Sequence, residues 1–134
     1  MGEKHSCDKS FPNCEGIVIE YEDKIKNKTL LMMGDVNYSS FNAARTAAGE
    51  PLFADSEIDF LIVPHHGSEH TDYERITDSG RIINKGDAAV ICCKNRPGKN
   101  RPNPKHQAEL KKRFAYVRTT EESPSGECSI TINL

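Results

Sequence analysis

Six stretches of the chain have the hydrophobic patterns of β-strands. The first and the last alternate between apolar and polar residues, which predicts strands with one buried face. Residues 29–33 and 59–63 are nearly continuous apolar runs, which are typical of strands covered on both faces. The predicted strands are residues 15–21, 29–33, 59–63, 88–92, 116–119 and 128–134.

A helix is predicted between the second and third strands, over residues 40–48. Ser39 or Ser40 can cap its N-terminus, because a serine hydroxyl accepts from the unpaired N–H groups of the first turn. Gly49 can end the helix in a left-handed conformation, and Pro51 prevents it from continuing.

Two further helices are predicted later in the chain. A short one covers residues 72–77, after the third strand. The other starts after Asn103, an expected N-cap, with Pro104 in its first turn. It runs to Arg113, and Glu109 lies one turn before Arg113, a spacing that favours an ion pair.

Strands and helices alternate along the chain, which predicts an α/β layer: a mixed sheet with helices packed on one face. Residues 15–21 and 29–33 are close enough in sequence to form an antiparallel hairpin. A helical crossover separates residues 29–33 from residues 59–63 and can make these two strands parallel neighbours. We expect one domain over residues 13–134, after a loose lead-in at 1–12.

Composition narrows the class of protein further. The net charge of −2 favours neither a nucleic-acid partner nor an acidic one, and no apolar run approaches the roughly 20 residues that cross a bilayer. The five cysteines include no Cys-x-x-Cys, so neither a disulfide framework nor a zinc ribbon is indicated. We expect reduced thiols in a cytoplasmic protein. The adjacent Cys92 and Cys93 end an apolar run and are predicted to pack rather than react.

Metal-type side chains follow two of the predicted strands. Asp35 comes after residues 29–33 and Gly34, and His65 and His66 follow the proline that ends residues 59–63. Ligands in open α/β sheets collect beyond the carboxyl ends of the strands. If the two strands are parallel neighbours, the carboxylate and an imidazole can share a cation such as zinc, manganese or iron.

These motifs carry a family resemblance. The order strand–Gly-Asp, helix, strand–His-His-Gly-Ser, strand, basic loop–Pro–helix, strand, hairpin resembles the C-terminal half of a metallo-β-lactamase-fold hydrolase. It is most similar to the hydrolase domain of bacterial DNA-uptake (competence) proteins and their stand-alone relatives. The stretch from Asn13 to Ile19 also resembles a strand that precedes Gly-Asp in that group, so the likeness covers about residues 12–134.

The resemblance implies a four-layer αββα sandwich, of which this chain would form half, and a site for two metal ions between the sheets. Asp35 matches the carboxylate that bridges both ions, and His66, with His65 as the alternative, matches a ligand of the second ion. Ser68 would shape the loop. The ions would activate water for attack on a phosphodiester, or on another ester or amide bond, so a nucleic acid is an expected substrate class.

The sequence departs from the family in one decisive respect. The motif His-x-His-x-Asp-His of the family's first half is absent from these 134 residues. His5, His70 and His106 are isolated and do not replace it, and Asn103 stands where many relatives carry the histidine of His-Pro.

Two expected ligands are fewer than the three protein ligands of most catalytic zinc sites, so the chain alone should bind metal weakly and hydrolyse little. Without the missing half, one apolar face of the sheet would be uncovered, and we expect a partner to bind it. A fragment of a longer gene, a subunit completed by a chain with the missing half or by a second copy, and a degenerate relative kept for binding all fit.

Other functions remain as alternatives. A non-catalytic α/β binding or interaction module derived from the same fold is the main one. Ser68 with a histidine and Asp35 suggests a hydrolytic triad, but the chain has no Gly-x-Ser-x-Gly. Cys92 or Cys93 with a histidine suggests a thiol nucleophile. The basic loop 94–105 could follow a phosphate backbone, although it contains no aromatic residues to stack on bases.

Overall fold

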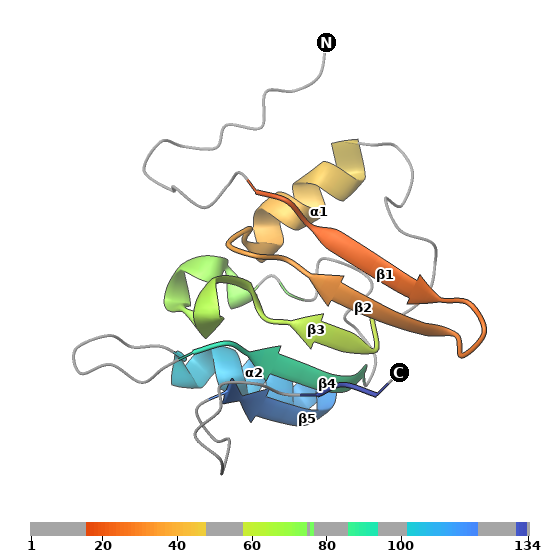
Figure 1. The fold of residues 1–134 in the computed structure, drawn as a ribbon. Coiled ribbons are helices and arrows are strands. Elements are labelled where there is room, and N and C mark those ends of the chain that lie inside the picture. Colours follow the sequence, from red (N-terminus) through yellow and green to blue (C-terminus); the bar gives the residue numbers. More distant parts are fainter. Residues whose placement is uncertain are drawn as a thin grey trace.

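The described part of the chain forms one five-stranded mixed sheet with α-helices on one face (Figure 1). The computed structural model describes residues 16–47, 58–74, 76, 86–93, 102–120 and 131–133. The elements, in chain order, are β1 (Ile19–Asp23), β2 (Lys28–Met32), α1 (Tyr38–Ala47), β3 (Phe60–Ile62), β4 (Gly86–Ile91), α2 (Pro104–Arg113) and β5 (Phe114–Thr119), with short 3-10 turns at Pro64–Gly67 and Glu69–Thr71.

The strands lie in the same order in the sheet as in the chain. β1 and β2 are antiparallel, which confirms the predicted hairpin. β2, β3, β4 and β5 are all parallel, which confirms that the second and third strands are parallel neighbours. The carboxyl ends of these four strands therefore meet at one edge of the sheet, where ligands of such sheets bind.

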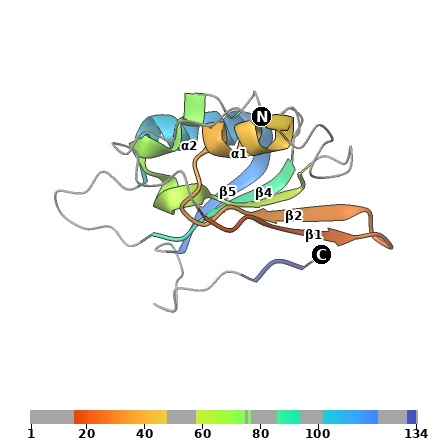
Figure 2. The ribbon, with the colours of Figure 1, turned by 90° about the horizontal axis from the view of Figure 1, so that it is seen from above.

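The hydrophobic core lies between the sheet and the two helices, which share one face (Figure 2). Leu31, Leu61 and Ala89 stand side by side on β2, β3 and β4, and each is completely buried. Phe41 of α1 and Leu110 of α2 belong to the same core. Burial of each such large side chain stabilises the fold by about 1.5–3 kcal/mol. The predicted arrangement of a mixed sheet with helices on one face is confirmed.

The opposite face of the sheet carries exposed apolar side chains. The strand register places Ile19 beside Met32 and Tyr21 beside Leu30, on the face turned away from the helices. Ile19 and Tyr21 are each 52% exposed, Met32 is 39% exposed, and Tyr116 on β5 is 62% exposed. Residues 131–133 lie on this side of the sheet (Figure 2).

Helix α1 starts earlier than residues 40–48 predict. It spans Tyr38–Ala47, and its cap is neither of the predicted serines. The side chain of Asn37 accepts from the N–H of Ser40 at 2.7 Å, so an asparagine just before the helix satisfies one of the free N–H groups of its first turn.

Helix α2 agrees with the prediction. Asn103 is its N-cap and accepts from the N–H groups of Lys105 and His106 at 2.9 and 3.2 Å. Glu109 and Arg113 form the expected pair, at 3.9 Å.

Of the predicted short helix at 72–77, the described residues Tyr73, Glu74 and Ile76 are in a 3-10 conformation, so the prediction holds for the part that is described. A separate 3-10 turn at Glu69–Thr71 precedes it, and Asp72 ends that turn in a left-handed conformation with φ of 53°. Among residues 128–134, only 131–133 are described, and these are not in a strand. The lead-in at 1–12 and most of the basic loop, residues 94–101, lie outside the described residues. No helix in the described ranges is both long enough and apolar enough to cross a bilayer.

Candidate metal centre at the carboxyl edge of the sheet

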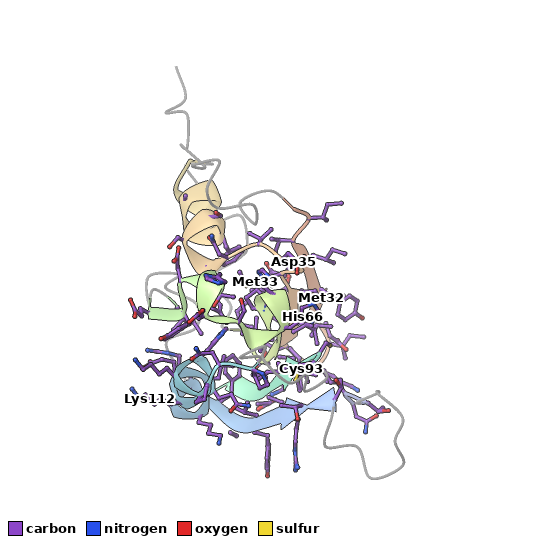
Figure 3. All side chains as sticks on the ribbon, turned by 90° about the vertical axis from the view of Figure 1, so that its left-hand side faces the viewer. Met32, Met33, Asp35, His66, Cys93 and Lys112 are labelled. Carbon is purple, nitrogen blue, oxygen red and sulfur yellow. The ribbon has the colours of Figure 1, made fainter. Side chains whose placement is uncertain are left out.

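Asp35 and His65 occupy equivalent positions on neighbouring strands. Met32 of β2 pairs with Ile62 of β3, and Asp35 and His65 are each the third residue beyond that pair. The N–H of His65 donates to the carbonyl oxygen of Gly34 at 2.9 Å, so the two loops are joined directly. Figure 3 looks onto this edge of the sheet and shows Asp35 and His66 together on it. The two loops that the sequence predicted to meet do so.

A tight turn presents Asp35. The N–H of Val36 donates to the carbonyl oxygen of Met33 at 3.0 Å and closes a four-residue turn after β2. Gly34 lies in this turn with φ of 56°, a left-handed conformation that glycine adopts without steric cost. The side chain of Asp35 is exposed, and its carboxylate is accessible to a cation.

The histidine loop has an unusual backbone. His65, His66 and Gly67 follow one another with φ of 47°, 56° and 70°, all in the left-handed region. Glycine adopts this region freely, but each histidine there costs about 1 kcal/mol or more. Strained residues of this kind persist only where the surrounding structure imposes them, and they cluster at binding and catalytic sites.

The ring of His66 is held in one orientation. Its Nδ1 hydrogen-bonds to the carbonyl oxygen of Cys92, at the end of β4. Because a carbonyl oxygen only accepts, Nδ1 carries a proton, and in the neutral ring Nε2 is then the nitrogen with the lone pair. Metal-binding histidines are commonly fixed in this way by a hydrogen bond from the other ring nitrogen. The side chain of His66 is exposed, so an ion can reach it.

His65 is the weaker candidate of the two histidines. Its side chain is only partly exposed, whereas that of His66 is exposed. The two rings lie edge to face, with centroids 6.3 Å apart and an angle of 76° between their planes. His66 is thus the more accessible of the two side chains, and the preference for His66 as a ligand stays a prediction.

Ser68 acts through its backbone. Its N–H donates to the carbonyl oxygen of His65 at 3.0 Å and closes the loop. Its carbonyl oxygen accepts from the hydroxyl of Thr71 at 3.0 Å. The side chain is buried, and within the described ranges its Oγ has no hydrogen-bond partner. Ser68 is therefore not bonded to a described histidine base, which argues against the hydrolytic triad.

The adjacent cysteines have different environments. Cys93 is buried in the core, as predicted, and its N–H donates to the hydroxyl of Thr120 at 3.1 Å. Cys92 is exposed, so the prediction that both cysteines pack is wrong for Cys92. It is the backbone carbonyl of Cys92, not its thiol, that the structure bonds to His66, and this gives no support for a thiol nucleophile.

His106, predicted to be isolated, is completely buried directly beneath the histidine loop. Its Nδ1 lies 3.2 Å from the carbonyl oxygen of Ser68, and its Nε2 lies 2.9 Å from the hydroxyl of Tyr38. Burial lowers the pKa of His106 to about 4, so the ring is neutral at neutral pH. One signal in the sequence could have found it: His106 is one helical turn before the buried Leu110 and shares its face.

Asp35 and His66 alone would not complete a metal site. Among the described residues, no group of three or more His, Cys, Asp or Glu side chains could hold a metal ion. The side chain of His70 is exposed, and its Nε2 lies 3.6 Å from Oε1 of Glu69. Asp35 and His66 have the oxygen and nitrogen donors that zinc accepts, but they provide two ligands where catalytic zinc generally has three. Any further ligands must come from outside the described residues.

Comparison of the chain with protein-family models, with curated proteins and with solved structures finds no match.

Proposed function

We propose that this chain is the C-terminal half of a metal-dependent hydrolase of the metallo-β-lactamase fold, in which Asp35 and His66 bind a metal ion. Zinc, manganese or iron suits these donors, and a complete site would hold two ions. When bound, such ions activate water and polarise the bond that is cleaved. A phosphodiester, including that of a nucleic acid, is the proposed substrate class.

One observation carries this proposal. The Nδ1 of His66 is bonded to the carbonyl oxygen of Cys92, which leaves Nε2 as the lone-pair nitrogen, while His65 and Gly34 join the histidine loop to the turn of Asp35. A histidine that is only solvated would have no reason to keep its ring in one orientation or its backbone in the left-handed region. The strain at His65 and His66 supports the same interpretation, because it has to be offset by the rest of the fold.

The shortage of ligands makes a partner part of the proposal. Two ligands hold zinc weakly, so the chain alone has little hydrolytic activity. The exposed apolar face over β1, β2 and β5 supports the same view, because apolar patches of this kind usually mark interaction surfaces. A chain that carries His-x-His-x-Asp-His on a second sheet would cover this face and add ligands. A second copy of this chain is the other proposed occupant.

The test of this proposal is reconstitution. The chain is co-expressed with the reading frame immediately upstream, purified as a complex and analysed for zinc, manganese and iron. We expect bound metal and hydrolysis of bis(p-nitrophenyl) phosphate in the complex, and far less of both in the chain alone. Asp35→Ala and His66→Ala should each remove the metal from the complex, whereas His70→Ala, an exposed histidine outside the centre, should not.

A complex that forms and contains none of these metals would contradict the proposed hydrolase. The second candidate, a non-catalytic binding module, then becomes the better account. It is favoured by the combination of an incomplete ligand set in the described residues and an exposed apolar sheet face. It predicts that Asp35→Ala and His66→Ala leave partner binding intact, while Ile19→Lys on the exposed face abolishes it.

A further inference from the structure

His106 has polar contacts that its place in the core does not require. Leu110, one turn later on the same face of α2, is buried with an apolar side chain. His106 instead contacts the hydroxyl groups of Tyr38 and Thr71 and the carbonyl oxygen of Ser68, at 2.9, 3.2 and 3.2 Å. The ring of Tyr73 is stacked on it, with centroids 5.3 Å apart. These contacts join α1, α2 and the histidine loop at one imidazole.

The contacts specify one form of the His106 ring. The carbonyl oxygen of Ser68 can only accept, so Nδ1 carries the proton. Nε2 then has a lone pair and accepts from the hydroxyl of Tyr38. Both bonds are satisfied by the neutral Nδ1–H tautomer, and Tyr38 orients the ring by completing its second bond.

Helix α2 holds two successive carbonyl groups of the loop. The N–H of Asn103 donates to the carbonyl oxygen of Gly67 at 2.8 Å, and the ring of His106 donates to that of Ser68. Both carbonyls directly follow His66, whose strained backbone needs to be held from outside. The start of α2 thus holds the segment that contains His66, the candidate ligand, through two hydrogen bonds.

We propose that His106, oriented by Tyr38, is a positioning residue that holds the backbone of residues 65–68 so that His66 presents its Nε2 at the carboxyl edge of the sheet. The identity of the ion rests on the function proposed above, whereas the positioning of His66 does not. His106 itself contacts neither an ion nor a substrate, because it is buried beneath the loop.

The experiment compares His106→Leu and His106→Asn in the full chain. Leucine fills the space without hydrogen bonds, whereas the amide nitrogen of asparagine stands close to the position of Nδ1 and can still donate to Ser68. Long-range ¹H–¹⁵N NMR spectra report the tautomer of His66. We expect a single Nδ1–H tautomer of His66 in the wild type and in His106→Asn, and a mixture of both tautomers in His106→Leu.

Two further variants keep the test decisive. Ile58→Val shortens a buried side chain of the same core and controls for a general loss of stability. If His106→Leu fails to fold, Tyr38→Phe replaces it, because this change keeps the ring and removes only the hydroxyl that orients His106. We expect Tyr38→Phe to give mixed tautomers of His66, and Ile58→Val to give the wild-type spectrum.

Zinc titration of the same variants separates the positioning from the proposed function. A misplaced ligand should lower zinc affinity by about 10-fold or more in His106→Leu, as changes around metal ligands do, with recovery in His106→Asn. Mixed tautomers in a chain whose wild type binds no zinc would support the positioning and contradict the metal site. A folded His106→Leu with the wild-type tautomer of His66 would overturn the positioning, whatever the zinc affinity.

Discussion

The carbonyl oxygen of Gly67 accepts a hydrogen bond from the N–H of Asn103 at 2.8 Å. This bond joins the histidine loop to the N-cap residue of α2. A Cβ at Gly67 would lie 3.1 Å from Pro102, in the segment before α2, and 3.2 Å from Ile91 of β4. Both the backbone conformation and the space at this position therefore require glycine.

Gly67→Ala should destabilise the protein more than Gly34→Ala. Both glycines have a positive φ, so each alanine is strained by about 1 kcal/mol. At Gly34 the nearest atom to an added Cβ is 3.7 Å away, an ordinary contact. At Gly67 the crowding adds about 1–3 kcal/mol. Urea denaturation of the two variants measures the difference, and equal losses would show that the loop is not braced by the segment before α2.

The stability of the protein should fall as the pH drops from about 6.5 to about 4, and His106 should be one identifiable cause. The pKa of His106 is lowered by burial from 6.5 to about 4 in the folded protein, so the unfolded chain binds a proton first. Protonation of the unfolded state removes up to about 3 kcal/mol of stability across this interval, with no further loss from this group below pH 4.

The variant His106→Asn isolates this contribution, because asparagine does not titrate. Burial raises the pKa of Tyr38, whose hydroxyl faces His106, so Tyr38 does not titrate over this pH range. We expect the free energies of unfolding of wild type and variant to differ by a constant amount above pH 7 and to converge toward pH 4. A difference that does not vary with pH would mean that His106 is not held neutral by burial.

The exposed sheet face should bind a partner through Ile19 and its neighbours. Ile19→Lys replaces a half-exposed side chain, so the free energy of unfolding should change by less than about 1 kcal/mol. The association of this chain with a chain that carries the missing half, or with a second copy of itself, should weaken strongly. Sedimentation velocity measures either association. Ile25→Lys is the matched control, because Ile25 is 97% exposed in the turn between β1 and β2. An equal effect of both variants would locate no interface on this face.

The sequence predicts well which strands and loops form the candidate site. The apolar runs of β2 and β3 are long enough to identify buried strands, and the crossover between them makes the strands parallel. The ends of parallel neighbours must then meet, so Asp35 and the histidines come together without any knowledge of side-chain contacts.

Features that depend on packing are harder to predict. The left-handed backbone of His65 and His66 cannot be predicted from the sequence, because glycine is the residue type that usually indicates a positive φ. His106 was missed because a single histidine in a charged helix usually faces solvent. Its spacing from Leu110 indicated a buried face, but the partners in Tyr38 and Ser68 come from distant segments that only the folded chain brings together.

The most direct test of the central claim, that Asp35 and His66 bind the same ion, is a double-mutant cycle for zinc binding. Zinc affinity is measured by competition with a chromogenic chelator for the wild type, Asp35→Ala, His66→Ala and the double variant, with His70→Ala as the control. We predict a loss of about 10-fold or more for each single variant, almost no further loss in the double variant, and none in His70→Ala. Unchanged affinity in either single variant, or losses that add independently, would contradict a shared ion.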